Sequence, residues 1–513
     1  MALNKRIVQD TFFFTIIICF LIIWKLPSFQ EIILNIDELE WIYCINKCYK
    51  NPIPFIGFDS HTTGPLGIYL LLPLKLIMKS PSVVALRIYG FIVFLIPTLI
   101  LVFASFKTTM KYFATLILVS LMSVYDKDFF AYNTEYPLLL FNAAIVYLML
   151  KENKKNYLMS LMITLIVLLP FIKFQAILLS VFYFIIILYK DVYLDKGKVS
   201  KPILIFLTVI IITTLFIGYY IGLNQFIYSF IVRNIFYASS FSTKSKTVTY
   251  IENVYIHFKF FGAYYLLIFT LFVKTILDKI KENTIKKDFL KTTKIFKYVF
   301  FGGLFIVSFI SIIIPKTNFA HYYMLMFLPI TYLISQFSSH LKINNYVKNI
   351  IIITLIIPIL NFYNNELYNK LIKGSFVNKL SYEQLQINTN NNKIINYLKN
   401  NHKEIKSIVV LGWFESLPFY YKLNNKYDTP YRSGHSDCLI SNNSNEKDDF
   451  EVNNFTYDLT DQECIIIDLE HVIPKINHKS KIKDLLKKYK SYKYSEEITF
   501  YVKKNTYEKT RCN

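Results

Sequence analysis

Long stretches of almost uninterrupted apolar sequence recur along the first 362 residues of this chain. The first begins at Thr11, and with its flanks it is long enough to cross the roughly 30 Å hydrocarbon core of a bilayer. Backbone N–H and C=O groups inside a bilayer must find their partners within the protein, so such runs fold as helices. The sequence therefore predicts an all-α polytopic membrane domain.

Eleven membrane-spanning helices are predicted. Their expected ranges are 11–34, 83–106, 112–124, 136–150, 157–171, 174–189, 203–222, 256–277, 298–314, 322–338 and 349–362. A further apolar stretch, Leu66–Met78, has about 13 residues and contains Pro73 and Lys75. That length is short for a crossing, so this stretch needs a separate argument.

The distribution of basic residues decides the topology. If Leu66–Met78 does not cross, about 21 of the 34 Lys and Arg residues before residue 363 lie inside, as the positive-inside rule requires. The decisive loop, 274–297, carries eight lysines. We therefore predict that Leu66–Met78 is an amphipathic helix along the outer interface. The N-terminus is then cytoplasmic, and the chain after the last span is extracytoplasmic.

The last 150 or so residues are polar and rich in Lys, Asn and Tyr. This change predicts two domains, a membrane domain at 1–362 and a soluble extracytoplasmic α/β domain at 363–513. The second domain has patterns typical of helices at 393–399 and 481–489 and of strands at 407–411, 464–468 and 498–502. The stretch 439–463 is rich in Asn, Ser and Asp and is predicted to be a loop.

Composition excludes a soluble enzyme, because 54% of the residues are hydrophobic and the mean hydropathy is +0.37. The net charge of +22 suggests a nucleic-acid partner at first. Membrane proteins accumulate Lys for topology, however, so we expect anionic membrane lipids as partners and no nucleic acid. The six cysteines have no zinc-type spacing, and Cys44 and Cys48 are predicted to be free thiols.

The predicted topology gathers the ionisable residues on the outer side. They are Asp37, Glu38, Glu40, Asp59, His61, Arg87, Asp126, Asp128, Glu135, Arg233, Lys316 and His321, with Asn234 and Tyr322 beside them. Transporters instead carry their polar groups near the bilayer midplane. The pattern favours a catalyst that works at the outer surface.

Several motifs, in this order along the chain, resemble the GT-C superfamily of membrane glycosyltransferases. They are IDELEW at 36–41, DSHTTGPLGIYL at 59–70, ALRIYGFIV at 85–93, DFFAYNTEYPLLL at 128–140, IKFQAILL at 172–179 and NFAHYYMLMFLPI at 318–330. The resemblance is to bacterial relatives of glycosyltransferase family 39, which includes protein O-mannosyltransferases and the aminoarabinose transferase. It implies a GT-C-like membrane domain in the bacterial cytoplasmic membrane. It also implies transfer of a sugar from a polyprenyl-phosphate donor to an envelope glycan, lipid or protein, with inversion at the sugar carbon.

The resemblance assigns the catalytic pair. Asp37 matches the family's catalytic aspartate and is expected to act as the base on the acceptor hydroxyl, with Glu38 as a positioning group. Arg87, which opens the second span, matches an arginine that stabilises the leaving phosphate. An interfacial arginine that binds a lipid head group is the alternative for Arg87.

Three further residues are candidates for the donor phosphate. His321 and Tyr322 match the family's His-Tyr pair, and Lys173, in the short link between the fifth and sixth predicted spans, can face the same anion. An interfacial belt of aromatic residues is the competing account of His321 and Tyr322.

Glu135 opens the fourth predicted span and matches a second acidic site of the family. It is a candidate for acceptor binding or for a divalent metal ion, and His61 is a second candidate for either role. Favourable charge at a helix N-terminus is the alternative for Glu135. Hard cations need several oxygen ligands, so metal dependence and any cofactor are left open.

Two other functions remain open. An O-antigen-type polymerase or ligase would carry a large outer loop in the middle of the chain, whereas here the large polar part is terminal. A transporter or flippase of lipid-linked saccharides would show internal repeats and charges at the midplane.

Overall fold

A computed structural model describes the chain in segments. The described residues are 2–29, 35, 37–58, 63–107, 109–123, 127–151, 156–191, 200–232, 234–235, 246–281, 293–314, 320–340, 396, 400, 407–411, 464–468, 486–493 and 498–503. They form two compact units, one made of 1–35, 61–70 and 84–373 and the other of 36–60, 71–83 and 374–513. The predicted domain boundary at 362/363 stays a prediction.

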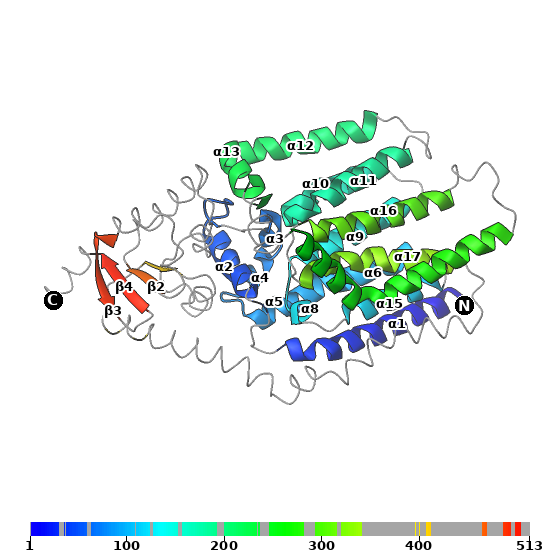
Figure 1. Cartoon of the computed structure of the whole chain (residues 1–513), viewed down its shortest axis with the longest axis horizontal. Coiled ribbons are helices and arrows are strands. Elements are labelled where there is room, and N and C mark those ends of the chain that lie inside the picture. The colour runs from blue at the N-terminus through cyan, green and yellow to red at the C-terminus, as the bar shows by residue number, and fades with distance from the viewer. Residues whose placement is uncertain are drawn as a thin grey trace. The chain divides into compact units, whose positions relative to one another are not determined.

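The first unit is a bundle of long helices that run side by side (Figure 1). One long element is α5 (Val83–Gly90), which continues through the π-helix η2 (Phe91–Leu95) into α6 (Ile96–Ser105). The other long elements are α1 (Ala2–Lys25), α7 (Met110–Met122), α9 (Glu135–Leu150), α10 (Asn156–Ile172), α11 (Ile177–Tyr189), α12 (Ser200–Tyr220), α15 (Lys246–Lys281), α16 (Thr293–Ile313) and α17 (Phe327–His340). Its short elements are η1 (Leu26–Ser28), α3 (Pro65–Tyr69), α8 (Lys127–Phe130), η3 (Phe174–Ala176), α13 (Leu223–Phe226), the π-helix η5 (Ile227–Val232) and η7 (Ala320–Met326).

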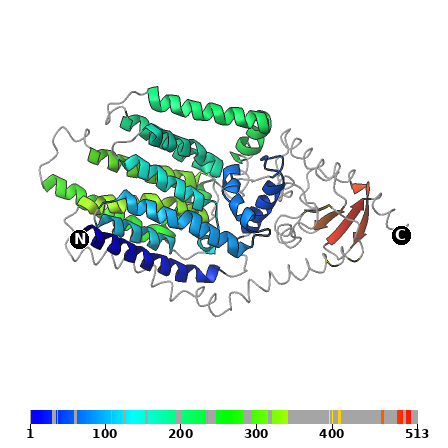
Figure 2. The same cartoon turned by 180° about the vertical axis from the view of Figure 1, so that it is seen from behind.

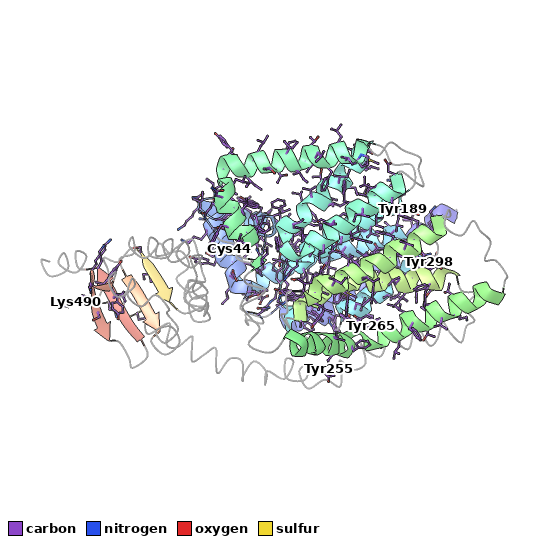
Figure 3. The ribbon with its side chains drawn as sticks, turned by 45° about the horizontal axis from the view of Figure 1, so that its top comes forward. Cys44, Tyr189, Tyr255, Tyr265, Tyr298 and Lys490 are labelled. Atoms are coloured by element: carbon purple, nitrogen blue, oxygen red, sulfur yellow. The ribbon has the colours of Figure 1, made fainter. Side chains whose placement is uncertain are left out.

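Apolar and aromatic side chains hold the bundle together. α10 packs on α9, α11 and α12, while α17 packs on α7, α15 and α16. The ring of Tyr265 on α15 lies 5.6 Å from that of Phe305 on α16, and Tyr298 on α16 lies 5.3 Å from Phe337 on α17 (Figure 3). α3, α8 and α13 lie at one end of the bundle and α1 begins at the other, as Figures 1 and 2 both show.

The predicted spans from 83–106 to 298–314 each overlap described helices, whereas the predicted start of 322–338 falls in the 3₁₀ helix η7 and α17 begins only at Phe327. Four helices are long and apolar enough to cross a membrane: Arg6–Lys25, Val83–Ser105, Pro202–Tyr220 and Phe296–Ile313. Shorter apolar helices cover the predicted spans at 112–124, 136–150, 157–171, 174–189 and 256–277, and the last predicted span, 349–362, lies outside the described residues. By their length and composition, these helices confirm the prediction that the chain is a helical membrane protein.

The predicted end of the first span was wrong. α1 ends at Lys25 rather than at 34, and the 3₁₀ turn η1 follows it. Pro27 explains the stop, because a proline disfavours the helical conformation of the residue before it. The hydroxyl of Ser28 donates to the carbonyl oxygen of Lys25 (2.7 Å) and so satisfies one of the acceptors left open at the helix end.

Leu66–Met78 is also divided. It forms α3 and a second short helix, α4 (Leu72–Ile77), rather than one continuous helix. Pro73 lies in the first turn of α4 and has no N–H to donate to the preceding turn, which breaks the helix at Leu70–Leu71.

The second unit contains α2 (Asp37–Lys50), α4 and a four-stranded sheet. Asp37 and Glu38 therefore begin α2, a helix separate from α1. Figure 3 labels Cys44 on α2. Cys44 and Cys48 are free thiols, as predicted.

The sheet has the order β1-β2-β4-β3. Its strands are β1 (Ile408–Leu411), β2 (Cys464–Asp468), β3 (Tyr489–Lys493) and β4 (Ile498–Lys503). β1 and β2 are parallel, and the two other pairs are antiparallel. The strands predicted at 407–411, 464–468 and 498–502 are present, but the helix predicted to reach 489 is wrong at its end, where Tyr489 starts β3. The predicted loop at 439–463 lies outside the described residues.

Candidate functional site

A break at the end of α10 forms the centre of the candidate site. Pro170 lies inside this helix and cannot donate to the carbonyl of Ile166. The hydroxyl of Ser180 on α11 donates to that carbonyl instead, at 2.8 Å. α10 ends two residues after the proline, at Ile172, and Lys173 takes an extended backbone conformation before η3.

The segment that leads into α3 is fixed against this break. The amide of Gly64 donates to the carbonyl of Ile172 (3.0 Å), and Thr63 forms an isolated β-bridge with Lys173. A Cβ atom on Gly64 would lie 1.9 Å from the carbonyl oxygen of Phe171, so only glycine allows this approach. The glycine of the TTGPLG stretch thus has a structural role beside the site.

The side chain of Lys173 is buried between an acid and an aromatic ring. Its ammonium donates to Oε1 of Glu135 in an ion pair and lies 4.1 Å from the centre of the Tyr322 ring. Glu135 is the first residue of α9, as predicted, where the helix N-terminus favours a carboxylate. It does not lie at a surface, however, because it is fully buried. Its second oxygen, Oε2, has no hydrogen-bond partner among the described residues.

His321 and Tyr322 complete the group. Both are buried in η7, which packs against α9 and α16, and their rings meet edge to face with centroids 4.6 Å apart. We call Glu135, Lys173, His321 and Tyr322 the Lys173 cluster. It brings three of the four residues predicted to bind the donor phosphate together with the acid Glu135. Lys173 and His321, which both contact Tyr322, are residue types that suit an anion.

Arg87 belongs to the same unit but makes a different contact. Its guanidinium donates to the carbonyl oxygen of Ser28 at 2.7 Å, and its side chain is buried. It therefore braces the turn after α1. A role in binding phosphate stays a prediction.

Lys25 was missed by sequence reasoning, which placed it inside the first span. Its buried ammonium donates to the carbonyl of Phe129 and to the hydroxyl of Tyr136 (3.0 Å). Tyr136 follows Glu135 at the start of α9, so Lys25 links the end of α1 to the helix that carries the acid. The sequence feature that could have indicated this role is a lysine inside an apolar run, two residues before Pro27.

Tyr132, in the segment between α8 and α9, is a further buried group beside the cluster. Burial raises the pKa of the Tyr132 phenol well above its ordinary value, and the charges of Tyr89 and Glu135 add to this. The Tyr132 phenol is neutral at physiological pH with or without this shift, and it can donate a hydrogen bond.

The predicted catalytic pair lies in the second unit. Asp37 is half-buried and Glu38 is fully buried in the first turn of α2, where acids are favoured. His61, Asp59, Asp126, Arg233 and Lys316 lie outside the described residues, as does the side chain of Asp128. Within the described part of the chain, no group of three or more His, Cys, Asp or Glu residues is placed to hold a metal ion. The metal role considered for Glu135 and His61 stays a prediction.

No protein-family model matches the sequence, and no curated protein matches it. The structure is similar to that of ArnT from Cupriavidus metallidurans bound to undecaprenyl phosphate. The TM-score is 0.53 at 9% sequence identity, over 96% of this chain and 97% of that one. A second solved structure is the Archaeoglobus fulgidus oligosaccharyltransferase in its apo form, with a TM-score of 0.35 at 12% identity over 88% of this chain and 70% of that one. This TM-score is too low to support a shared fold. The likeness to ArnT confirms the GT-C fold predicted from the motifs.

Proposed function

We propose that this chain, which has the GT-C fold, is a glycosyltransferase that moves a sugar from a polyprenyl-phosphate donor to an envelope acceptor outside the cell. The observation that carries the proposal is the Lys173 cluster in a chain that shares its fold with ArnT, whose structure holds undecaprenyl phosphate. The acceptor is a glycan, a lipid or a protein. Membrane lipids surround the helices, and the polar C-terminal domain is extracytoplasmic.

The chemistry needs a site that stabilises a leaving phosphate. As the bond between the sugar and the phosphate oxygen breaks, negative charge grows on that oxygen, and fixed cations in a dry site stabilise it well. Lys173 and His321 are suited to this role because both are buried and adjoin Tyr322. Arg87 is proposed to assist them.

The second requirement is a base for the acceptor hydroxyl. We assign this role to Asp37, with Glu38 as its positioning neighbour, on the strength of the Asp-Glu motif at the start of α2. Direct attack by the acceptor on the sugar carbon, with the phosphate leaving from the opposite face, inverts that carbon. Any metal ion would come in addition to these residues.

The test is sugar release from a polyprenyl-phosphate donor by the purified full-length protein in detergent. Asp37→Asn should lower the rate by about 10²–10⁴-fold, the usual cost of losing a general base, without changing expression or elution from a sizing column. Asp191→Asn is the matched control, since Asp191 is also a half-buried acid, and it should keep the wild-type rate. Near-normal turnover by Asp37→Asn would overturn the assignment, and a wild type without transfer would favour a transporter.

A further inference from the structure

The ion pair of the Lys173 cluster leaves one buried carboxylate oxygen without a hydrogen-bond partner among the described residues. Lys173 and Glu135 cancel each other's charge, and both are buried. One oxygen of Glu135 binds Lys173, while Oε2 has no hydrogen-bond partner among the described residues. A buried ion pair stabilises a fold only when its remaining polar atoms are satisfied. Stability alone therefore does not explain why an acid stands beside this lysine.

The proposed reaction changes the charge of the phosphate. The donor is a phosphodiester and carries one negative charge. When the acceptor oxygen bonds to the sugar carbon, the bond between sugar and phosphate breaks, its electron pair stays on the phosphate, and the acceptor's proton passes to the base. The product is a polyprenyl phosphate monoester, which carries about −1.5 to −2 at pH 7 because its second pKa is about 6. A strongly cationic site would hold this product more tightly than the donor.

We propose that Glu135, acting through Lys173, weakens the binding of the polyprenyl phosphate product more than that of the donor and so promotes product release. Coulomb energy scales with the charge of the ligand, so a fixed carboxylate repels a dianion about twice as strongly as a monoanion. The ion pair places that carboxylate directly on the ammonium that the phosphate approaches. Glu135 is thus a positioning residue that sets the charge of the site, and the inference rests on the proposed function.

The binding experiment uses undecaprenyl phosphate without any sugar as its probe, added to the purified full chain in detergent. Undecaprenol, the same lipid without the phosphate, separates binding of the tail from binding of the anion. Glu135→Gln, which removes the charge and keeps the shape, should bind undecaprenyl phosphate about tenfold more tightly than wild type. Lys173→Met should bind it at least tenfold more weakly. Undecaprenol should bind all variants equally.

Two controls separate charge from shape. Glu135→Asp keeps the charge and should show no gain in affinity. Asp10→Asn makes the same kind of change in another lysine–carboxylate pair, Asp10 on α1 with Lys111 on α7 (2.5 Å). Its affinity should stay within twofold of wild type. A gain limited to Glu135→Gln is not produced by damage to the fold.

A measurement on the wild type alone covers the case in which Glu135→Gln does not fold. Wild type should bind undecaprenyl phosphate and its singly charged methyl ester within about threefold of each other, since the carboxylate cancels the advantage of the second charge. Weaker or unchanged binding by a folded Glu135→Gln, or a preference above tenfold for the dianion in wild type, would overturn the inference. If wild type binds undecaprenyl phosphate no better than undecaprenol, the proposed function itself fails.

Discussion

Burial controls the chemistry of single side chains outside the spans, and Cys48 on α2 gives a direct test. Burial raises the pKa of the Cys48 thiol to about 12 from an ordinary value of 9.0. The thiolate is the reactive form, so the folded protein holds Cys48 in its unreactive state. At pH 8.5 its alkylation by iodoacetamide should be at least about a hundredfold slower in the native protein than after unfolding in SDS. Mass spectrometry of the Cys48 peptide measures both rates, and equal rates would show that the thiol is accessible and ionised.

At the scale of elements, the contact between the start of α3 and the break in α10 depends on Gly64. Gly64→Ala should destabilise the protein by about 1–3 kcal/mol, because the new methyl group would overlap the backbone of Phe171. Gly218→Ala is the matched control, since a Cβ atom there meets nothing within 4 Å and alanine favours the helix α12. Thermal unfolding in detergent should show a lower midpoint for Gly64→Ala alone. Equal midpoints for the two variants would mean that α3 is not held at this point.

At the scale of the whole molecule, the placement of basic residues predicts the topology. A reporter that is active only outside the cell should give a signal when it is fused after Tyr43 or after Asn513, and it should be silent after Lys286. The physical reason is the eight lysines at 274–297, because the positive-inside rule predicts a cytoplasmic position for a loop so rich in lysine. A signal at Lys286, or none at Asn513, would place the candidate site on the wrong side of the membrane for an envelope acceptor.

The sequence by itself determined which segments are helices in the membrane. Apolar runs must satisfy their own backbone groups there, so their position fixes the helix whatever its neighbours are. The start of α9 at Glu135 and the link at Lys173 follow from this rule. Outside the predicted spans, short apolar patterns predicted β1, β2 and β4. The sequence predictions were wrong at Pro27, where a proline ends the helix, and at Tyr489, where β3 begins.

Only the tertiary structure decided which of the candidate residues meet. Glu135 and Lys173 are 38 residues apart, and no pattern in the chain links them. Their pairing depends on the packing of α9 against α10, on the break after Pro170, and on the placement of Tyr322 by η7. Periodicity reports how a helix faces its surroundings, whereas a contact between side chains depends on the angle and depth at which two helices pack.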